Sequence, residues 1–466
     1  MTTAAAVPRD DVAQLSVISN RQLLRELFAL AMPVWAEQVF HMLVGLNDTY
    51  LANHLPRDAA SAGAAVGTIT YFLWFIGLIV GSVGAGSTAI IARAKGAQHR
   101  RLANSVTGQS VSATVLIGIV VGAILFFAAR PIIAATQLQG PAFGLAFSYL
   151  RMLSIAMPFT MLMLIAGSCL RGGGDTLTPG VMMVALDVIN MVASFALCRG
   201  WWGLPVMGFD GIAAGTVIAY VCGGIIAFIV LLRPNGAVRL FLHRLAPHWI
   251  TIKRLFRIGV PALVGDLLGW FANLGVIGVV NRIDPTNAMS AAHINAVRIE
   301  SISFLTGIAF AIAAATMVGT SLGQRDQRRA TRSAYLAYCV GGGLMTLCGI
   351  LMIVLGRYPA RWLSPADPHI IQLTTTCLFI TGFIQCGFAA NLIFGGALRG
   401  AGDTFVVMCL NLTTVVGIRF VGVIIVGVWL HQGLAAIWCV LAGELFLRGL
   451  LVYLRFVQGG WKKIQV

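Results

Sequence analysis

The chain has 466 residues, of which 58% are hydrophobic and only 10% are charged, and its formal net charge is +16. Soluble domains usually contain about 45–50% apolar and about 25% charged residues, so this composition excludes an ordinary soluble protein. The excess of Lys and Arg does not indicate a nucleic-acid partner, because these residues stand in short runs between apolar segments. We therefore expect a multi-pass membrane protein.

Apolar stretches of about 20 residues, the length that crosses a bilayer as a helix, recur along the whole chain. They are bounded by charged residues, Pro or Gly, and they predict an all-α fold with twelve transmembrane helices. The predicted helices begin near Leu27, Ala62, Val106, Phe143, Leu177, Gly211, Ile258, Ala291, Ser333, Ile370, Phe405 and Leu434.

The positive residues are distributed unequally between the two sides of the predicted bundle. Of the 32 Lys and Arg residues, twenty-two fall on the side of the two termini, six on the other side and four within the spans. Because cytoplasmic loops are enriched in Lys and Arg, this asymmetry predicts cytoplasmic termini and an even number of spans. We expect a monomer in the cytoplasmic (inner) membrane, with membrane lipids around it.

Two nearly identical stretches, "LRGGGDT" from Leu170 and "LRGAGDT" from Leu398, stand 228 residues apart. The same offset aligns "MPVWAEQVF" with "VPALVGDLL" by their prolines, Pro33 and Pro261. A constant offset predicts two copies of a six-helix unit. Because six is even, both copies start on the same side, so they are parallel repeats about an axis along the membrane normal. A cleft between such halves favours a transporter.

Each glycine-rich motif follows the fourth helix of its half, where we expect a tight turn rather than a ligand loop. Asp175 and Asp403 are predicted to cap the helices that follow. The chain then divides into five parts: a cytoplasmic amino-terminal segment (1–26), a six-helix lobe (27–232), a basic linker (233–257), a second six-helix lobe (258–457) and a cytoplasmic tail (458–466).

Carboxylates inside apolar spans are costly, and they are functional candidates for that reason. If the first helix runs outward, Asp48 lies roughly 8 Å below the outer surface, at a rise of about 1.5 Å per residue. The same count places Asn190, Ser194 and Thr216 between roughly 6 and 12 Å below that surface. A carboxylate surrounded by amide and hydroxyl oxygens suits Na⁺ or a titrating proton, so we predict a cation-coupling site in the first lobe.

Further acids lie in other spans. Asp266 and Glu300 fall toward the membrane centre in the second lobe, where they are candidates for contact with a cationic substrate or an ion. Arg298 is an alternative partner for Asp266 in a structural ion pair. Glu37, in the first helix, is a further candidate, and the sequence suggests no partner for it. Glu444 and Arg448 are four residues apart and predict a pair on one helix face.

With these features, the chain resembles the multidrug and toxic compound extrusion family. The likeness covers nearly the whole chain and is carried by "MPVWAEQ" and "LNDTYLA" in the first helix, by the two Gly-Asp turns, and by "SAAHINAVRIESISFLTGIAFAIAAATMVGTSLGQ" in the eighth helix. The resemblance implies two six-helix lobes that form a V and export of small organic, often cationic, compounds. It also implies coupling to entry of Na⁺ or protons, with no ATP and no redox cofactor.

The resemblance points to the same first-lobe residues. It implies that Asp48, Asn190 and Thr216 form the family's cation motif, where Na⁺ could bind. Many members have a second Asp one turn after the Asn, where this chain has Ser194. Asp187, one turn before Asn190, is the replacement that the sequence offers. This departure leaves Na⁺ and protons both open as the coupling ion.

Two other classes of function fit the sequence less well. A flippase for lipid-linked precursors would usually have a cationic cleft and additional helices, whereas the acids within these spans favour cationic cargo. An enzyme would need a catalytic motif, and the sequence has no GxSxG, HExxH or GxxxxGK[ST] pattern. The nine cysteines include no CxxC pair, so we expect neither disulfides nor a cysteine metal site.

Overall fold

The structure is a computed structural model that describes residues 19–55, 59–234, 236–284, 288–365 and 367–464. Within these ranges the regular structure is helical throughout. Eleven helices in the described part are long and apolar enough to span a membrane. The pair α13 (Pro368–Phe383) and α14 (Gln385–Gly400), bent by 58°, makes a twelfth span when counted as one. The predicted all-α, twelve-helix fold is confirmed.

The first lobe contains six long helices and one short one. These are α1 (Asn20–Asn53), α2 (Ala59–Gly96), α3 (Arg100–Phe127), α4 (Ala129–Ala135), α5 (Pro141–Gly172), α6 (Leu177–Arg199) and α7 (Phe209–Leu232). Helices α2, α3, α5, α6 and α7 share one apolar core. A single 3₁₀ turn, η2 (Trp201–Gly203), connects α6 to α7, and another, η3 (Leu242–Arg244), lies in the connection to the second lobe.

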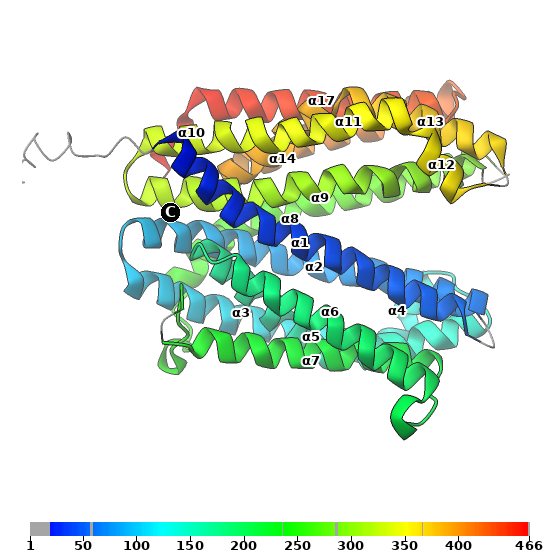
Figure 1. Cartoon of the computed structure of the whole chain (residues 1–466), viewed down its shortest axis with the longest axis horizontal. Coiled ribbons are helices and arrows are strands. Elements are labelled where there is room, and N and C mark those ends of the chain that lie inside the picture. The colour runs from blue at the N-terminus through cyan, green and yellow to red at the C-terminus, as the bar shows by residue number, and fades with distance from the viewer. Residues whose placement is uncertain (1–18, 56–58, 235, 285–287, 366, 465–466) are drawn as a thin grey trace, which may run out of the picture.

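The second lobe repeats this plan with more interruptions. It contains α8 (Trp249–Ile283), α9 (Ala288–Gly323), α10 (Gln327–Ala337), α11 (Gly343–Leu355), α12 (Arg357–Leu363), the bent pair α13 and α14, α15 (Thr404–Thr414), α16 (Val421–Ile424) and α17 (Leu434–Gln458). Three π-helical segments, η4 (Tyr338–Gly342), η5 (Val415–Phe420) and η6 (Ile425–Trp429), interrupt the ninth and eleventh spans, and the 3₁₀ turn η7 (Gly460–Lys463) follows α17. Figure 1 shows the two lobes side by side, with blue to green helices in one and green to red helices in the other.

Several helices begin before the positions expected from hydropathy. Helix α1 begins at Asn20, inside the segment 1–26, of which residues 1–18 lie outside the described structure. Helix α8 begins at Trp249, inside the linker 233–257. Hydropathy detects only the part of a helix that matches the hydrocarbon core, whereas the backbone hydrogen bonds continue into the polar interface.

Helix α1 contacts both lobes. Its first half buries Leu23, Leu27 and Ala31 in the apolar core of the second lobe. The helix, which contains Pro33, also packs on α6 of the first lobe. Figure 1 shows α1 running diagonally from one lobe to the other. A movement between the lobes must therefore move or bend α1.

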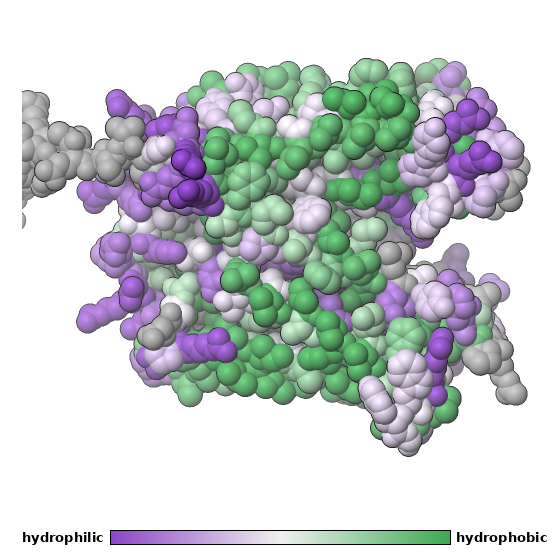
Figure 2. All heavy atoms as spheres, in the orientation of Figure 1, coloured by the Kyte–Doolittle hydropathy of each residue, from purple (hydrophilic) through white to green (hydrophobic). Residues whose placement is uncertain are grey.

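The lobes meet at the end of the bundle where α2 and α9 finish, which we call the basic end because it carries Arg93, Lys95 and Arg325. Here glycines allow backbones to touch: a Cβ added at Gly96 would collide with the carbonyl oxygen of Thr320, and one at Gly323 with that of Arg93. At the opposite end the lobes separate, and Figure 2 shows a notch there, lined by polar residues beyond an apolar belt. We call this the open end.

Candidate functional site

The predicted cation-coupling residues of α6 and α7 lie together in the interior of the first lobe. The side-chain amide of Asn190 donates to the Thr216 hydroxyl at 3.1 Å. The Thr216 hydroxyl also lies 3.0 Å from the hydroxyl of Tyr149 on α5. Ser194, one turn after Asn190, donates to the Ile212 carbonyl at 3.5 Å. Asp187, Asn190 and Ser194 follow one another at spacings of three and four residues, so they lie on one face of α6, and this face is buried against α7.

Two carboxylates lie beside this cluster. Asp48 on α1 and Asp187 on α6 are 8% and 4% exposed, and they are close enough to interact electrostatically. Among the described residues, neither oxygen of Asp187 has a hydrogen-bond partner, and the same holds for Asp48 Oδ1 and Asn190 Oδ1. Buried acceptors without partners are costly. Four such oxygens in one region are an arrangement that protons or a small hard cation would stabilise.

Two tyrosines outside the predicted set adjoin these carboxylates. Tyr149 is 2% exposed and interacts electrostatically with Asp48. Tyr220, on α7, interacts with both Asp48 and Asp187. The sequence analysis did not single out these two tyrosines. Their position within apolar spans was the available signal, because a buried Tyr hydroxyl usually needs a polar partner nearby.

Glu37 and Asp266 have arginine partners, and both partners come from the repeated motif. Arg171 of "LRGGGDT" donates to both carboxylate oxygens of Glu37 at 3.2 Å. Arg399 of "LRGAGDT" donates to Asp266 at 3.2 Å. Arg298, the alternative partner for Asp266, forms no ion pair with it among the described residues, so that alternative was wrong. The two motif arginines thus bind an acid on the first helix of their own half.

The motifs themselves form turns, as expected. Gly174 and Gly402 have φ values of 78° and 86°, which favour glycine. Asp175 accepts a hydrogen bond from the backbone of Thr178 at 2.9 Å, so it caps α6 as predicted. Asp403 makes no such cap and instead accepts from Arg455 at 2.9 Å. The capping prediction for Asp403 was wrong because an arginine on α17 occupies its carboxylate.

Glu300 lies at the break between α13 and α14. The Thr381 hydroxyl donates to Glu300 Oε1 at 2.6 Å, and the Ser303 hydroxyl donates to Gln385 Oε1 at 2.7 Å. Asp266 instead contacts the far end of α14 through Arg399. Asp266 and Glu300, which were predicted to flank the cleft together, therefore differ in their partners: Asp266 binds an arginine, whereas Glu300 binds a hydroxyl group.

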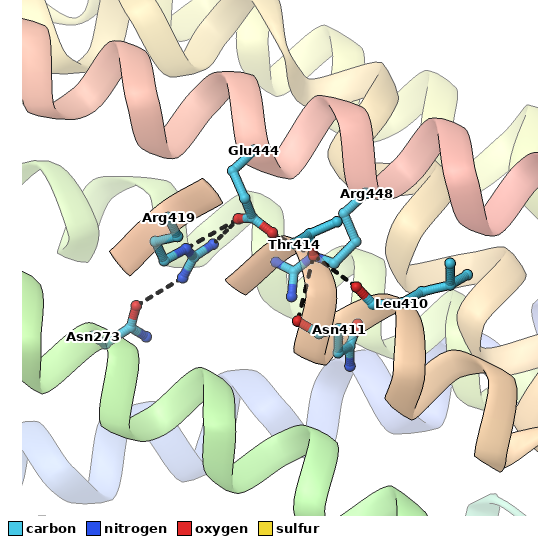
Figure 3. A network of polar contacts seen from close by, with 7 residues as sticks. All are labelled: Asn273, Leu410, Asn411, Thr414, Arg419, Glu444 and Arg448. Atoms are coloured by element: carbon cyan, nitrogen blue, oxygen red, sulfur yellow. Dashed lines mark hydrogen bonds and ion pairs between the residues drawn. The ribbon is translucent and has the colours of Figure 1, made fainter. Parts of the chain in front are cut away.

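The interior of the second lobe also contains a network around Glu444, drawn in Figure 3. Arg419 donates to Glu444 Oε2 at 3.0 and 2.6 Å and to Asn273 Oδ1 at 3.0 Å. Arg448 Nε lies 3.2 Å from Glu444 Oε1, so the predicted pair of Glu444 and Arg448 is confirmed. The participation of Arg419 was not predicted, because that residue lies on a different helix.

No group of three or more His, Cys, Asp or Glu side chains in the described part of the chain has a metal-binding arrangement. All nine cysteines are free thiols in the structure. A Na⁺ site needs no such group, since carboxylate, amide and hydroxyl oxygens can supply its ligands. The first-lobe cluster contains oxygens of these three kinds.

Comparisons with known proteins agree on one family. The family model described as MatE matches residues 33–196 and 261–425. The probable multidrug resistance protein NorM of Thermotoga maritima is 26% identical over 445 residues, covering 95% of this chain and 94% of that protein. The multidrug resistance protein PmpM of Pseudomonas aeruginosa is 26% identical over 403 residues, covering 85% of this chain and 83% of that protein.

Solved structures show the same fold. An outward-facing multidrug resistance MATE family transporter has a TM-score of 0.86 at 18% identity, covering 95% of this chain and 98% of that one. A MOP superfamily transporter from Pyrococcus furiosus, described as having a binding pocket of reverse polarity, has the same TM-score, identity and coverage. At this identity the likeness shows the architecture of two six-helix lobes and nothing about the cargo.

Proposed function

The chain belongs to the MatE family of multidrug transporters, and from this premise we propose that it exports small organic compounds in exchange for an inward cation. The observation that carries the proposal is the first-lobe cluster. Asp48 and Asp187 are buried next to Asn190 and Thr216, and both oxygens of Asp187 and Oδ1 of Asp48 have no partner among the described residues, so they can accept a proton or coordinate Na⁺. No nucleotide or redox cofactor takes part in this scheme.

The cation would act through α1. Neutralising Asp48 and Asp187 removes their mutual repulsion and lets α1 and α6 pack differently around the cluster. Because the first half of α1 is buried in the second lobe, this repacking changes the contact between the lobes. The cation drives the change only if it binds the two arrangements unequally, which is the thermodynamic requirement for coupling.

We further propose an orientation. The basic end carries most of the Lys and Arg residues and both ends of the described chain, so it faces the cytoplasm of a bacterial inner membrane. The open end then faces outward, and the arrangement described above is the outward-open state of an alternating-access cycle. The inward-open state requires the glycine contacts between α2 and α9 to separate.

The contacts of the remaining acids suggest how cationic cargo would be held. Glu37 and Asp266 are occupied by Arg171 and Arg399, so they serve best as structural anchors. Glu300 accepts a hydrogen bond from the Thr381 hydroxyl and forms no ion pair with the described residues. It is therefore the second-lobe acid that we propose for contact with a cationic substrate or an ion.

Transport by purified protein in liposomes tests the proposal. Efflux of ethidium, a permanent organic cation, would be followed under an imposed Na⁺ gradient and, separately, under a pH gradient. We expect one of the two gradients to accelerate efflux by wild type and not by Asp48→Asn. Asp367→Asn is the matched control, because Asp367 caps α13 away from the cluster. Ethidium flux that ignores both gradients would refute cation coupling.

A further inference from the structure

A hollow of about 550 Å³ lies at the open end of the second lobe, where α12 begins beside α13. It is lined by Arg357 and by residues of α13 that lie between Pro368 and Phe379. The lining residues of α13 recur every three or four positions, so they belong to one face of this helix. Pockets that hold small molecules usually measure about 300–1,000 Å³. The hollow is therefore large enough for part of an organic ligand.

The lining face of α13 runs from the end of the helix into the membrane. Pro368 is the first residue of α13, and Phe379 lies eleven residues later, so the face extends over roughly 16 Å at about 1.5 Å per residue. The hydrocarbon core of a bilayer is about 30 Å thick, which leaves about 15 Å for each leaflet. The hollow thus matches the depth of one leaflet.

The hollow belongs to the surface that faces lipid. In Figure 1, α11 and α13 lie in the part of the second lobe that is turned away from the first lobe. Helix α11 packs against α13 and exposes apolar side chains such as Leu347, Ile350 and Val354. Figure 2 shows the apolar belt of this lobe ending in polar residues at the open end. A ligand would therefore enter the hollow from the bilayer and not from the space between the lobes.

The polarity of the lining changes with depth. Arg357 lies at the open end and forms no hydrogen bond or ion pair with the described residues. Deeper along α13, the hydroxyls of Thr375 and Thr376 donate to carbonyls of their own helix, so they need no further partner. Phe379 ends the lining with an apolar ring. This order suits a ligand with an anionic head and an apolar body.

Two aromatic residues of α12 indicate the depth of the head group. Tyr358 and Trp362 follow Arg357 in the same short helix, and both are exposed. Tyr and Trp are enriched at the boundary between hydrocarbon and water, because each combines an apolar ring with a polar group. Arg357 is therefore at the level where lipid phosphates lie.

We propose that the hollow binds a phospholipid of the adjacent leaflet, with the phosphate held by Arg357 and one acyl chain lying along α13. A guanidinium donates two parallel hydrogen bonds to a phosphate, and the exposed amide of Gln372 supplies another donor in the same hollow. The acyl chain covers the deeper part of the lining as far as Phe379. This inference goes beyond the proposed export and requires only that the chain spans a bilayer, whichever end faces the cytoplasm.

A matched pair of photoreactive lipids tests the proposal on the full-length protein in nanodiscs. Phosphatidylglycerol and diacylglycerol carry the same diazirine on one acyl chain, so they differ only in the phosphoglycerol head group. Mass spectrometry measures the labelling of residues 368–383, normalised to that of residues 116–127, an exposed apolar part of α3 near the same end. We expect wild type to be labelled about tenfold more by phosphatidylglycerol, as charge-assisted hydrogen bonds to the phosphate predict.

Arg357→Gln should make the two lipids label the hollow equally. Arg361→Gln is the matched control, because Arg361 is an exposed arginine of the same helix that does not belong to the lining, and it should keep the wild-type ratio within about twofold. Equal labelling of wild type by both lipids would overturn the proposal without any variant, so the test holds even if Arg357→Gln fails to fold. A ratio that persists in a folded Arg357→Gln, or that both variants lose equally, would also overturn it.

Two competitors separate a lipid from other ligands. With inorganic phosphate in excess, unchanged labelling by phosphatidylglycerol supports a lipid site, whereas loss of labelling would assign Arg357 to a soluble anion and refute the proposal. Displacement of the lipid by ethidium would make the hollow part of the cargo path and would also refute it. Failure of the export proposal looks different, because it appears in dye efflux and leaves the ratio of lipid labelling unchanged.

Discussion

At the scale of single residues, partners decide what a buried acid can do. Glu37 and Asp266 each bind an arginine and are therefore neutralised in place. Both oxygens of Asp187 and Oδ1 of Asp48 have no hydrogen-bond partner among the described residues, and for this reason we propose them as the site of a cation or a proton. Glu444 binds two arginines, Arg419 and Arg448, deep in the second lobe. The residue type is nearly the same throughout, so the difference arises from the neighbours.

Asp48→Asn removes one charge from the first-lobe cluster and keeps the side-chain shape. We expect gradient-driven efflux to fall at least about tenfold, which is within the usual range of coupling free energies. The measurement is the initial rate of dye efflux from liposomes under the gradient that drives wild type. Thr216→Val, which removes one hydroxyl and no charge, should reduce the rate less. A larger loss in Thr216→Val than in Asp48→Asn would contradict the assignment.

Glu444→Gln tests the arginine network. Removing one partner from a buried ion pair costs about 3–5 kcal/mol, because the arginines are left without their anion. We therefore expect a clear drop in the melting temperature of the purified protein. Glu26→Gln is the matched control: Glu26 binds Arg329 at 2.8 Å, but its side chain is 35% exposed, so the expected cost is below about 1 kcal/mol. Equal melting temperatures of the two variants would count against a buried network.

At the scale of helices, contact between α2 and α9 closes the basic end. Both helices have glycines where their backbones meet, and Arg93 of α2 belongs to the same contact, because its backbone lies against Gly323. Elsewhere α2 has glycines with open space around them, such as Gly77. Gly96 thus allows α2 to approach α9 closely, whereas Gly77 of the same helix makes no such contact.

Gly96→Ala should weaken closure of the basic end, because the new methyl group meets the Thr320 carbonyl. The population is then expected to shift away from the outward-open arrangement. Pulsed electron spin resonance between labels at Trp202 and Trp362, two exposed positions on the open end of different lobes, measures this as a shorter distance. Gly77→Ala, on the same helix, should leave the distance distribution unchanged. An identical distribution in all three proteins would show that the glycine contact does not set the equilibrium.

At the scale of the whole molecule, Arg93 connects the first lobe to two parts of the second. Its guanidinium donates to the Ala401 carbonyl in the second glycine-rich turn at 2.7 Å. It also donates to the Ile464 carbonyl, beyond η7, at 2.6 Å. Trp461 of η7 is 0% exposed and stacks on Phe456, so the end of the described chain is held firmly against the second lobe.

Arg93→Gln should therefore loosen the basic end in the same direction as Gly96→Ala. Gly96→Ala disturbs the contact between the lobes by a steric clash, whereas Arg93→Gln removes hydrogen bonds across it, because the shorter amide cannot reach both the Ala401 and the Ile464 carbonyls. The same spin-label pair provides the measurement, with Arg325→Gln as a control for loss of positive charge at that end. A change of equal size in the control would attribute the effect to net charge rather than to the two hydrogen bonds.

Much of the architecture is predictable from the linear chain. Span number and the parallel halves follow from hydropathy and from the offset between Pro33 and Pro261. The pair of Glu444 and Arg448 was predictable because both residues lie on one helix, at a spacing that the helix geometry sets. The assembly of Asn190 with Thr216 was anticipated by counting depth along two helices.

The contacts between helices, in contrast, were decided only by the tertiary structure. Asp266 binds Arg399 instead of Arg298, Arg171 binds Glu37, and Arg419 joins Glu444, each across a distance in sequence that no periodicity encodes. Such partners depend on how each helix is rotated and on how the lobes are packed. The sequence by itself determined the number, direction and repetition of the helices, because these depend on local hydrophobicity. Which charges are paired and which stay unfilled was decided by packing, because pairing depends on positions in space.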